Sequence, residues 1–240
     1  MFFGLLSAQN VSISSNGDTG TSGTNWSTSG TNPVVISIAN TSSSIDINTS
    51  VIKGYLESGA DVVVEHILWT NNSNEISLDN DLVVNSSSEQ TLTFKAYGKV
   101  KINDNVEIES TGDKLNLILW SNATAADGNH STVDINKGAS IITNGGFLHL
   151  AGGLDNGANG GTSSDGIPDG YSHSYDSGGA VGFGDRLNSN NATVSILTNG
   201  GDIIVRGKGD YTSGIVFQDN IKIDSGTGKI DMESNSKYRI

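Results

Sequence analysis

The chain contains no cysteine among its 240 residues and only 2 prolines. The missing thiols exclude disulfide bonds, thiolate metal sites and cysteine nucleophiles. Any exported form must therefore be stabilised by its core and its backbone hydrogen bonds alone. The scarcity of proline leaves backbone ladders almost uninterrupted, which suits a chain built from many paired strands.

Basic residues are the second shortage. The chain has 13 Lys and Arg against 26 Asp and Glu, which gives a formal net charge of −13 at pH 7. A surface this acidic repels phosphate backbones and anionic lipids, so we expect no nucleic-acid partner. No apolar segment is long enough to cross a bilayer, and we expect no membrane insertion.

Apolar residues make up only 35% of the chain, while glycine alone numbers 31. The apolar residues gather in short clusters that alternate with polar ones, and this period of two predicts strands with one buried face. The clusters are Val34–Ile38, Ile45–Ile47, Val62–Val64, Ile76–Leu78, Leu82–Val84, Leu92–Phe94, Val100–Ile102, Val106–Ile108, Leu115–Leu119, Val133–Ile135, Val194–Ile196, Ile215–Phe217, Ile221–Ile223 and Ile230–Met232. No stretch keeps a period of 3.6 over three turns, so we expect essentially no helix.

One short motif recurs. Thr143–Gly146 (Thr-Asn-Gly-Gly) returns as Thr198–Gly201, and a short alternating strand follows each copy. Repeated turn-and-strand units indicate a solenoid, in which stacked coils share one core. An antiparallel β-sandwich is the alternative, because it also places strands every eight to twelve residues or so.

Three segments are expected along the chain. Residues 1–8 are apolar and end in small residues, which predicts a partial signal peptide, although a first buried strand is the alternative. Residues 9–75 are expected to form an N-terminal cap and the first coils. Residues 76–240 are expected to form the solenoid repeats, with a Gly-, Asp- and Ser-rich loop insertion at 154–191. The signal peptide predicts a secreted or cell-surface protein.

The block from Lys114 to Gly153 resembles the repeats of filamentous-haemagglutinin-like bacterial surface proteins. It contains Leu115–Trp120, then Val133–Ala139, then Ile141–Gly146, and Thr198–Gly207 repeats the last of these elements. The resemblance covers roughly residues 75–235. It implies a right-handed parallel β-helix, export from a bacterial cell, and a part in adhesion or biofilm. The secretion domain that such proteins often carry is not recognisable in residues 9–75.

This resemblance implies a non-catalytic adhesin or stalk segment that belongs to a longer chain. Its expected partner is a surface glycan or a protein receptor. Two alternatives remain. Parallel β-helices also include polysaccharide lyases and glycoside hydrolases, for which Asp46, Glu107, Asp134 and Asp231 are available on outward strand faces. The chain could also be a purely structural spacer.

The expected insertion contains a candidate cation site. Asp165–Gly170 (Asp-Gly-Ile-Pro-Asp-Gly) resembles a short piece of the calcium-binding thrombospondin type 3 repeats. Calcium takes six to eight oxygen ligands, which closely spaced carboxylates supply. The candidate ligands are Asp165, Asp169 and Asp176, with Asp155 and Asp185 nearby. The alternative is a polar turn, and we expect no resident cofactor.

Aromatic residues suggest a contact surface in the same insertion. Tyr171, His173 and Tyr175 are the candidates for direct contact with a ligand. Trp69 and Trp120 follow apolar runs, and either pack over a coil end or stack on sugar rings. The chain's 4 histidines share no metal-ligand spacing, so we expect none of them to bind a metal.

Overall fold

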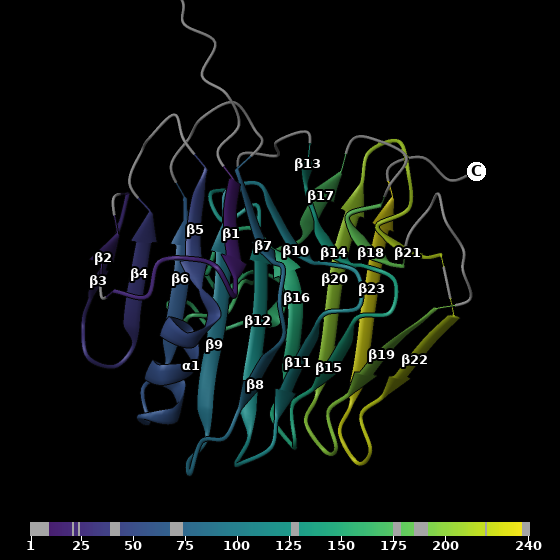
Figure 1. Ribbon diagram of the computed structural model, residues 1–240. Helices are drawn as coiled ribbons and strands as arrows, with labels where there is room; N and C mark the ends of the chain where they lie inside the picture. Colours follow the sequence, from purple (N-terminus) through teal and green to yellow (C-terminus); the bar gives the residue numbers. More distant parts are fainter. Residues whose placement is uncertain are drawn as a thin grey trace, which may run out of the picture.

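The computed structural model describes residues 10–20, 22–23, 25–38, 44–67, 74–125, 130–174, 179–184, 192–218 and 220–236. The expected signal peptide at residues 1–8 lies outside these residues. The described chain is all-β, with strands that lie side by side along one axis from the purple end to the yellow end of Figure 1.

The strands form three sheets. Sheet A has seven strands in the spatial order β5 (Ile45–Asn48), β1 (Asn10–Ser14), β7 (Glu75–Leu78), β10 (Lys99–Ile102), β14 (Val133–Ile135), β18 (Val181–Phe183) and β21 (Ile215–Phe217). Sheet C has five, namely β8 (Leu82–Val84), β11 (Glu107–Ser110), β15 (Ser140–Ile142), β19 (Thr193–Leu197) and β22 (Asn220–Asp224).

Sheet B has eleven strands. Its main path runs through β2 (Ser22–Gly23), β3 (Trp26–Ser29), β4 (Val34–Ile38), β6 (Val62–His66), β9 (Gln90–Ala96), β12 (Leu115–Ser121), β16 (Leu148–Gly152) and β20 (Ile203–Gly209). Strand β23 (Ile230–Ser236) pairs with β20, as does β17 (Ser172–Ser174), which also pairs with β13 (His130–Ser131).

Consecutive strands visit the three sheets in turn. Strands β10, β11 and β12 lie in sheets A, C and B, and β14, β15 and β16 follow the same order. We call each such group a triplet. Neighbouring triplets pair in parallel, whereas pairing between described strands is antiparallel only at β2–β3, β3–β4 and β13–β17. An antiparallel β-sandwich would require antiparallel neighbours throughout, so this alternative does not describe the three sheets.

Residues of the same type stack along the axis, because the triplets pair without slipping in register. In sheet A, Val100 pairs with Val133, which pairs with Val181. Two residues further along the strands, the buried Phe183 pairs with Phe217, which is 51% exposed, and their rings stack with centroids 5.1 Å apart. These columns form one continuous buried core between the three sheets. The predicted apolar clusters supply its strands, which confirms the period-two pattern as the signal that specifies them.

The connections between strands differ in length according to which two sheets they join. Those from sheet C to sheet B are uniformly short, at residues 85–89, 111–114, 143–147, 198–202 and 225–229. Those from sheet B to sheet A range from residues 97–98 to residues 153–180. Extra sequence is therefore concentrated where sheet B strands end, and the scaffold beneath it stays regular.

The connections from sheet C to sheet B, which we call the short corner, contain the repeated Thr-Asn-Gly-Gly motif. The buried hydroxyl groups of Thr143 and Thr198 donate to the carbonyl oxygens of Gly146 and Gly201, each over 2.5 Å. Ser225 closes the next turn in the same way onto Gly228, over 2.6 Å. Successive turns are also joined, because the amide of Gly145 donates to the carbonyl of Thr198 over 2.6 Å.

The absence of helix was a wrong prediction, because α1 spans Thr49–Glu57. The Asn48 side chain accepts the amide of Ser50 and so caps the helix N-terminus. Val51, Ile52 and Leu56 are buried, and α1 packs beside β8, the edge strand of sheet C. A nine-residue helix with only these buried positions is too short to show a helical period in the sequence.

The segment 154–191 is not one uninterrupted loop, as was expected. It contains β17 and β18, and the fully buried Val181 and Phe183 of β18 belong to the core of sheet A. The glycines around this short strand lower the local apolar content, so the sequence pattern did not indicate a strand there. In the region expected to form the N-terminal cap and first coils, β1 lies between β5 and β7. None of the described helices is long and apolar enough to cross a membrane.

Candidate ligand-binding groove

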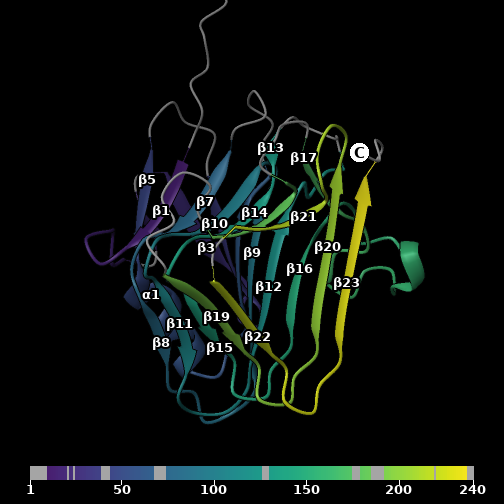
Figure 2. The ribbon, with the colours of Figure 1, turned by 90° about the vertical axis from the view of Figure 1, so that its right-hand side faces the viewer.

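Residues 153–171 follow β16 and fold over the outer face of sheet B. We call this segment the insertion. It includes a short helical turn, η1 (Ala158–Gly160), which projects sideways beyond β16, β20 and β23 in Figure 2. Asp155 accepts the amide of Gly166, over 2.8 Å. Asp169 accepts the amides of Asn156 and Gly157, over 2.7 and 2.6 Å. The insertion therefore has a defined internal structure built on two aspartates.

The insertion is anchored by Trp120 on β12. The indole nitrogen donates to the carbonyl oxygen of Gly153 over 2.8 Å, and the ring is only 4% exposed. Trp120 forms a buried cluster with Ile118 and Ala123, and Phe147 and Ile167 pack against this cluster. Lys95 lies over the indole ring, with Nζ 4.4 Å from the ring centroid. A second, smaller apolar cluster therefore lies outside the main core.

His149 is also covered. It occupies an outward position on β16, as its alternation with leucine predicts, yet it is only 5% exposed. Burial lowers its pKa to about 4, and the positive charge of Arg206 adds to this effect while Asp169 opposes it. His149 is consequently neutral at pH 7 and belongs to the packed base of the insertion.

A groove of about 350 Å³ lies next to this packed cluster. Its lining includes the apolar side chains of Val63, Ile118, Phe147 and Ile167, which we call the groove floor. The volume lies within the usual range for small-molecule sites, about 300 to 1,000 Å³. The groove lies between the outer face of sheet B and the tip of the insertion, and residues far apart in the chain form it.

The polar lining of the groove comes from both sides. Thr91 and Thr93 contribute hydroxyl groups from β9. Asp61, directly before β6, and Asp165, in the insertion, contribute carboxylates. Asp61 Oδ1 accepts the amide of Thr91 over 2.7 Å, and Asp165 Oδ1 accepts the amide of Ile167 over 2.9 Å. Each carboxylate is thus oriented by a hydrogen bond to one of its two oxygens.

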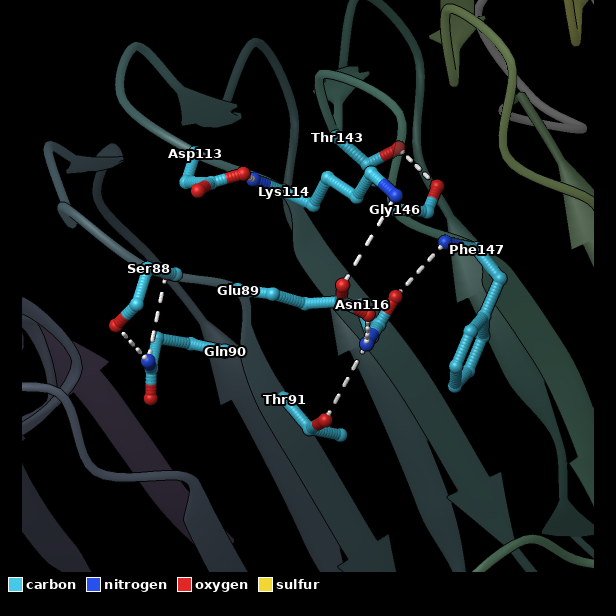
Figure 3. A network of polar contacts seen from close by, with 10 residues as sticks. All are labelled: Ser88, Glu89, Gln90, Thr91, Asp113, Lys114, Asn116, Thr143, Gly146 and Phe147. Atoms are coloured by element: carbon cyan, nitrogen blue, oxygen red, sulfur yellow. Dashed lines mark hydrogen bonds and ion pairs between the residues drawn. The ribbon is translucent and has the colours of Figure 1, made fainter.

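Figure 3 shows a polar network around Asn116 that includes two of the groove-lining residues, Thr91 and Phe147. Asn116 Oδ1 accepts the amide of Phe147 over 3.1 Å. Asn116 Nδ2 donates to Glu89 over 2.9 Å and lies 3.5 Å from the hydroxyl of Thr91. Asn116 therefore joins two lining residues, Thr91 on β9 and Phe147 just before β16, through one largely buried amide.

The predicted calcium ligands have other partners. Asp165 and Asp169 accept amide hydrogens of their own loop, as the polar-turn alternative predicts, and Asp169 is 2% exposed. Asp155 has the same role, while Asp176 and Asp185 lie outside the described residues. Within the part of the chain that the structure describes, no three carboxylate or imidazole groups gather where they could hold a metal.

The predicted contact residues that the structure describes, Tyr171 and His173, have separate surroundings. Tyr171 lines a separate pocket of about 220 Å³, and its hydroxyl donates to Glu233 over 2.5 Å. Burial and this carboxylate raise the pKa of Tyr171 to about 12. His173 is only 1% exposed and its Nε2 lies 3.5 Å from Asp210, so its ring faces protein. Tyr175 and Trp69 lie outside the described residues.

Sequence reasoning missed most of the groove. Of its lining residues, it singled out Asp165 alone as a site residue. One signal was present, because Leu117–Trp120 is apolar at every position. A strand that is apolar on both faces is covered on both faces. Searches against protein-family models, curated proteins and solved structures find no match to this chain.

Proposed function

We propose that the chain is a right-handed parallel β-helix and that it acts as a non-catalytic adhesin or stalk segment. In this proposal it is secreted or displayed at a cell surface, and it binds a surface glycan or a protein receptor through the groove. The resemblance to filamentous-haemagglutinin-like proteins supports export and adhesion. The proposal separates the scaffold, which sets the shape, from the groove, which makes the contact.

The strand order supports the helical architecture. Triplets visit sheets A, C and B in the same order and pair in parallel with the next triplet. Connections between parallel strands are right-handed in nearly all proteins, because the strand twist favours that hand. In a helix of this kind each of the three sheets has one outward face, and additional loops lie on those faces.

The observation that carries the binding function is the groove between Asp61 and Asp165. It combines an apolar floor with hydroxyl and carboxylate groups at its sides, which is the composition of a recognition site. The insertion that forms one side is stabilised by its own hydrogen bonds. A preformed surface of this type binds with little cost for ordering.

A glycoside hydrolase is the second candidate, because two carboxylates line the same groove. The hydrogen bonds of Asp61 and Asp165 favour binding instead, because each carboxylate is held by a backbone amide, that of Thr91 for Asp61 and that of Ile167 for Asp165. A purely structural spacer would need no such groove.

An attachment assay tests the proposal. Beads coated with the full chain are incubated with cell surfaces and extracellular polysaccharides, and bound beads are counted. Ile167→Asp places a charge on the groove floor, and we expect it to reduce attachment at least tenfold. Ile230→Asp is the matched control, because Ile230 is 45% exposed on β23, away from the groove.

The same incubations report on the alternatives. Release of reducing ends or unsaturated products from any polysaccharide would favour the enzyme. An absence of attachment across the whole panel would favour the spacer. Equal attachment by the Ile167→Asp chain would remove the groove from the proposed function.

A further inference from the structure

We propose that the groove binds a neutral pyranose of a glycan, with one face of the sugar ring on Phe147 and its hydroxyl groups toward Asp61 and Asp165. The identity of the glycan as a surface ligand rests on the proposed function. The chemical class of the ligand rests on the groove itself.

The floor fits the carbon face of a sugar ring. Phe147 is partly buried and packs against the cluster that contains Ile118 and Trp120, which restricts the motion of its ring. Val63 and Ile167 extend the apolar surface on either side. A pyranose presents a face of C–H groups that packs on an aromatic ring, while its hydroxyl groups point sideways. The apolar floor alone would accept many ligands, so the sides of the groove decide the class.

Charge excludes an acidic sugar. The lining contains two carboxylates, Asp61 and Asp165, and neither Lys nor Arg is among the residues that line it. A uronic acid or a sulfated sugar would therefore meet like charge without compensation. The net charge of −13 extends this repulsion to long anionic chains.

The carboxylates fit neutral hydroxyl groups well. Each already accepts one backbone amide through Oδ1, which fixes its orientation. The second oxygen of each can accept a sugar hydroxyl in a charge-assisted hydrogen bond. Thr91 and Thr93 add groups that both donate and accept. The groove thus offers hydrogen-bonding groups next to an apolar surface. A sugar ring has the matching arrangement, with hydroxyl groups around a face of C–H groups.

A cationic peptide is the competing occupant, since carboxylates and an aromatic ring also attract ammonium and guanidinium groups. Its charge would be stripped of water above four apolar side chains, Val63, Ile118, Phe147 and Ile167. Pairing with the two carboxylates would have to offset this loss, and charges removed from water often regain less than they lose. The neutral sugar is therefore the better match.

Calorimetric titration of the full chain tests the inference. The probes are neutral hexasaccharides of glucose, mannose, galactose and xylose, an oligogalacturonate, and an oligoarginine peptide. We expect saturable binding of at least one neutral hexasaccharide and none of the oligogalacturonate. Phe147→Ala should weaken that binding about tenfold, a loss of about 1.4 kcal/mol. Thr91→Val, which keeps the shape of the side chain, should weaken it several-fold.

Phe217→Ala is the matched control, because Phe217 is a half-exposed aromatic residue on β21 that lies outside the groove. We expect its affinity to stay within twofold of the unaltered chain. Binding of oligoarginine alone, or equal loss in the Phe147 and Phe217 variants, would overturn the inference. Bead attachment that no neutral hexasaccharide inhibits would also overturn it and would leave the proposed adhesive function intact. Hexasaccharide binding without bead attachment would support the site and contradict the adhesive function.

Discussion

Asn116 and Phe147 are joined across β12 and the start of β16 by a 3.1 Å hydrogen bond from the Phe147 amide to the Asn116 side chain. The same side chain donates to Glu89 over 2.9 Å, so one amide group connects three successive triplets. The position of Phe147 in the groove therefore depends on a residue that is almost inaccessible to solvent.

Replacement of Asn116 should destabilise the protein and the groove together. Asn116→Ala leaves the Phe147 amide and the Glu89 carboxylate without this partner, and we expect the free energy of unfolding to fall by about 1 to 3 kcal/mol. Urea denaturation measures the change. Asn235→Ala on β23 is the control, because Asn235 is exposed, and it should change stability by less than about 0.5 kcal/mol. Equal effects at the two positions would contradict this role.

Trp120 should be more sensitive than Trp26 to the loss of its indole nitrogen. Trp120→Phe removes the donor to Gly153, and we expect a loss of about 1 to 2 kcal/mol together with faster amide exchange in the insertion. Trp26 is equally buried, but its nitrogen has no hydrogen-bond partner among the described residues. Trp26→Phe removes the same atoms without breaking a hydrogen bond, so it should cost less. The reverse order would refute the anchoring role of Trp120.

The hydroxyl groups at the short corner should contribute measurably to stability. Thr198→Val keeps the shape of the side chain but leaves the Gly201 carbonyl without the 2.5 Å hydrogen bond. We expect unfolding free energy to fall by about 1 to 2 kcal/mol. Thr193→Val, at an exposed position of the neighbouring β19, should be nearly neutral. Similar unfolding curves for both variants would show that the corner hydrogen bond is unimportant.

Acid should destabilise the fold through two buried histidines. Burial lowers the pKa of both His66 and His149 to about 4, below the usual 6.5. The unfolded chain therefore binds more protons than the folded chain between these values. The stability that the neutral rings contribute is complete above pH 6.5 and is lost as the pH falls toward 4, on the order of 3 kcal/mol for each ring.

A variant isolates this effect from the titration of the carboxylates. His149→Gln removes one of the two rings, so its stability should fall less steeply than that of the unaltered chain between pH 6.5 and pH 4. Urea midpoints measured across this interval give the difference. Parallel curves for the two proteins would contradict the lowered pKa of His149.

Engineered cysteines test the register directly, because the natural chain contains none. Ser140 on β15 pairs with Ser195 on β19, and Cα atoms of paired residues lie within disulfide range. Ser140→Cys with Ser195→Cys should oxidise almost completely under mild oxidant, as free-thiol titration measures. Ser140→Cys with Thr193→Cys moves one cysteine two residues along the strand, and it should stay reduced. Oxidation of the second pair instead would refute the register.

Much of the scaffold could be predicted from the sequence, because a half-buried strand repeats its pattern every two residues. Val133–Ile135 and Val194–Ile196 were identified in this way, and both lie in observed strands. Helix α1 was missed because its few buried residues span only nine positions. Strand β18 was missed because Gly182 occupies its outward position, which leaves little alternation to detect.

The groove could not be predicted in the same way. Asp61 and Asp165 lie on different elements, and nothing in their local sequence indicates that they line one surface. Their proximity depends on how far the insertion extends over sheet B, which is a tertiary property. The aspartates of the insertion illustrate a related limit, since a carboxylate that caps a loop and one that binds calcium occur in similar motifs.

The uneven corners of the fold bear on how such a protein diversifies. Connections from sheet C to sheet B keep nearly constant length, while those from sheet B to sheet A vary widely. Mutation can therefore lengthen, shorten or replace segments at one edge without disturbing the stacked hydroxyl groups at the other. A lineage built on this plan could acquire new ligand specificities by exchanging segments at a single edge, while the three-sheet scaffold would change little.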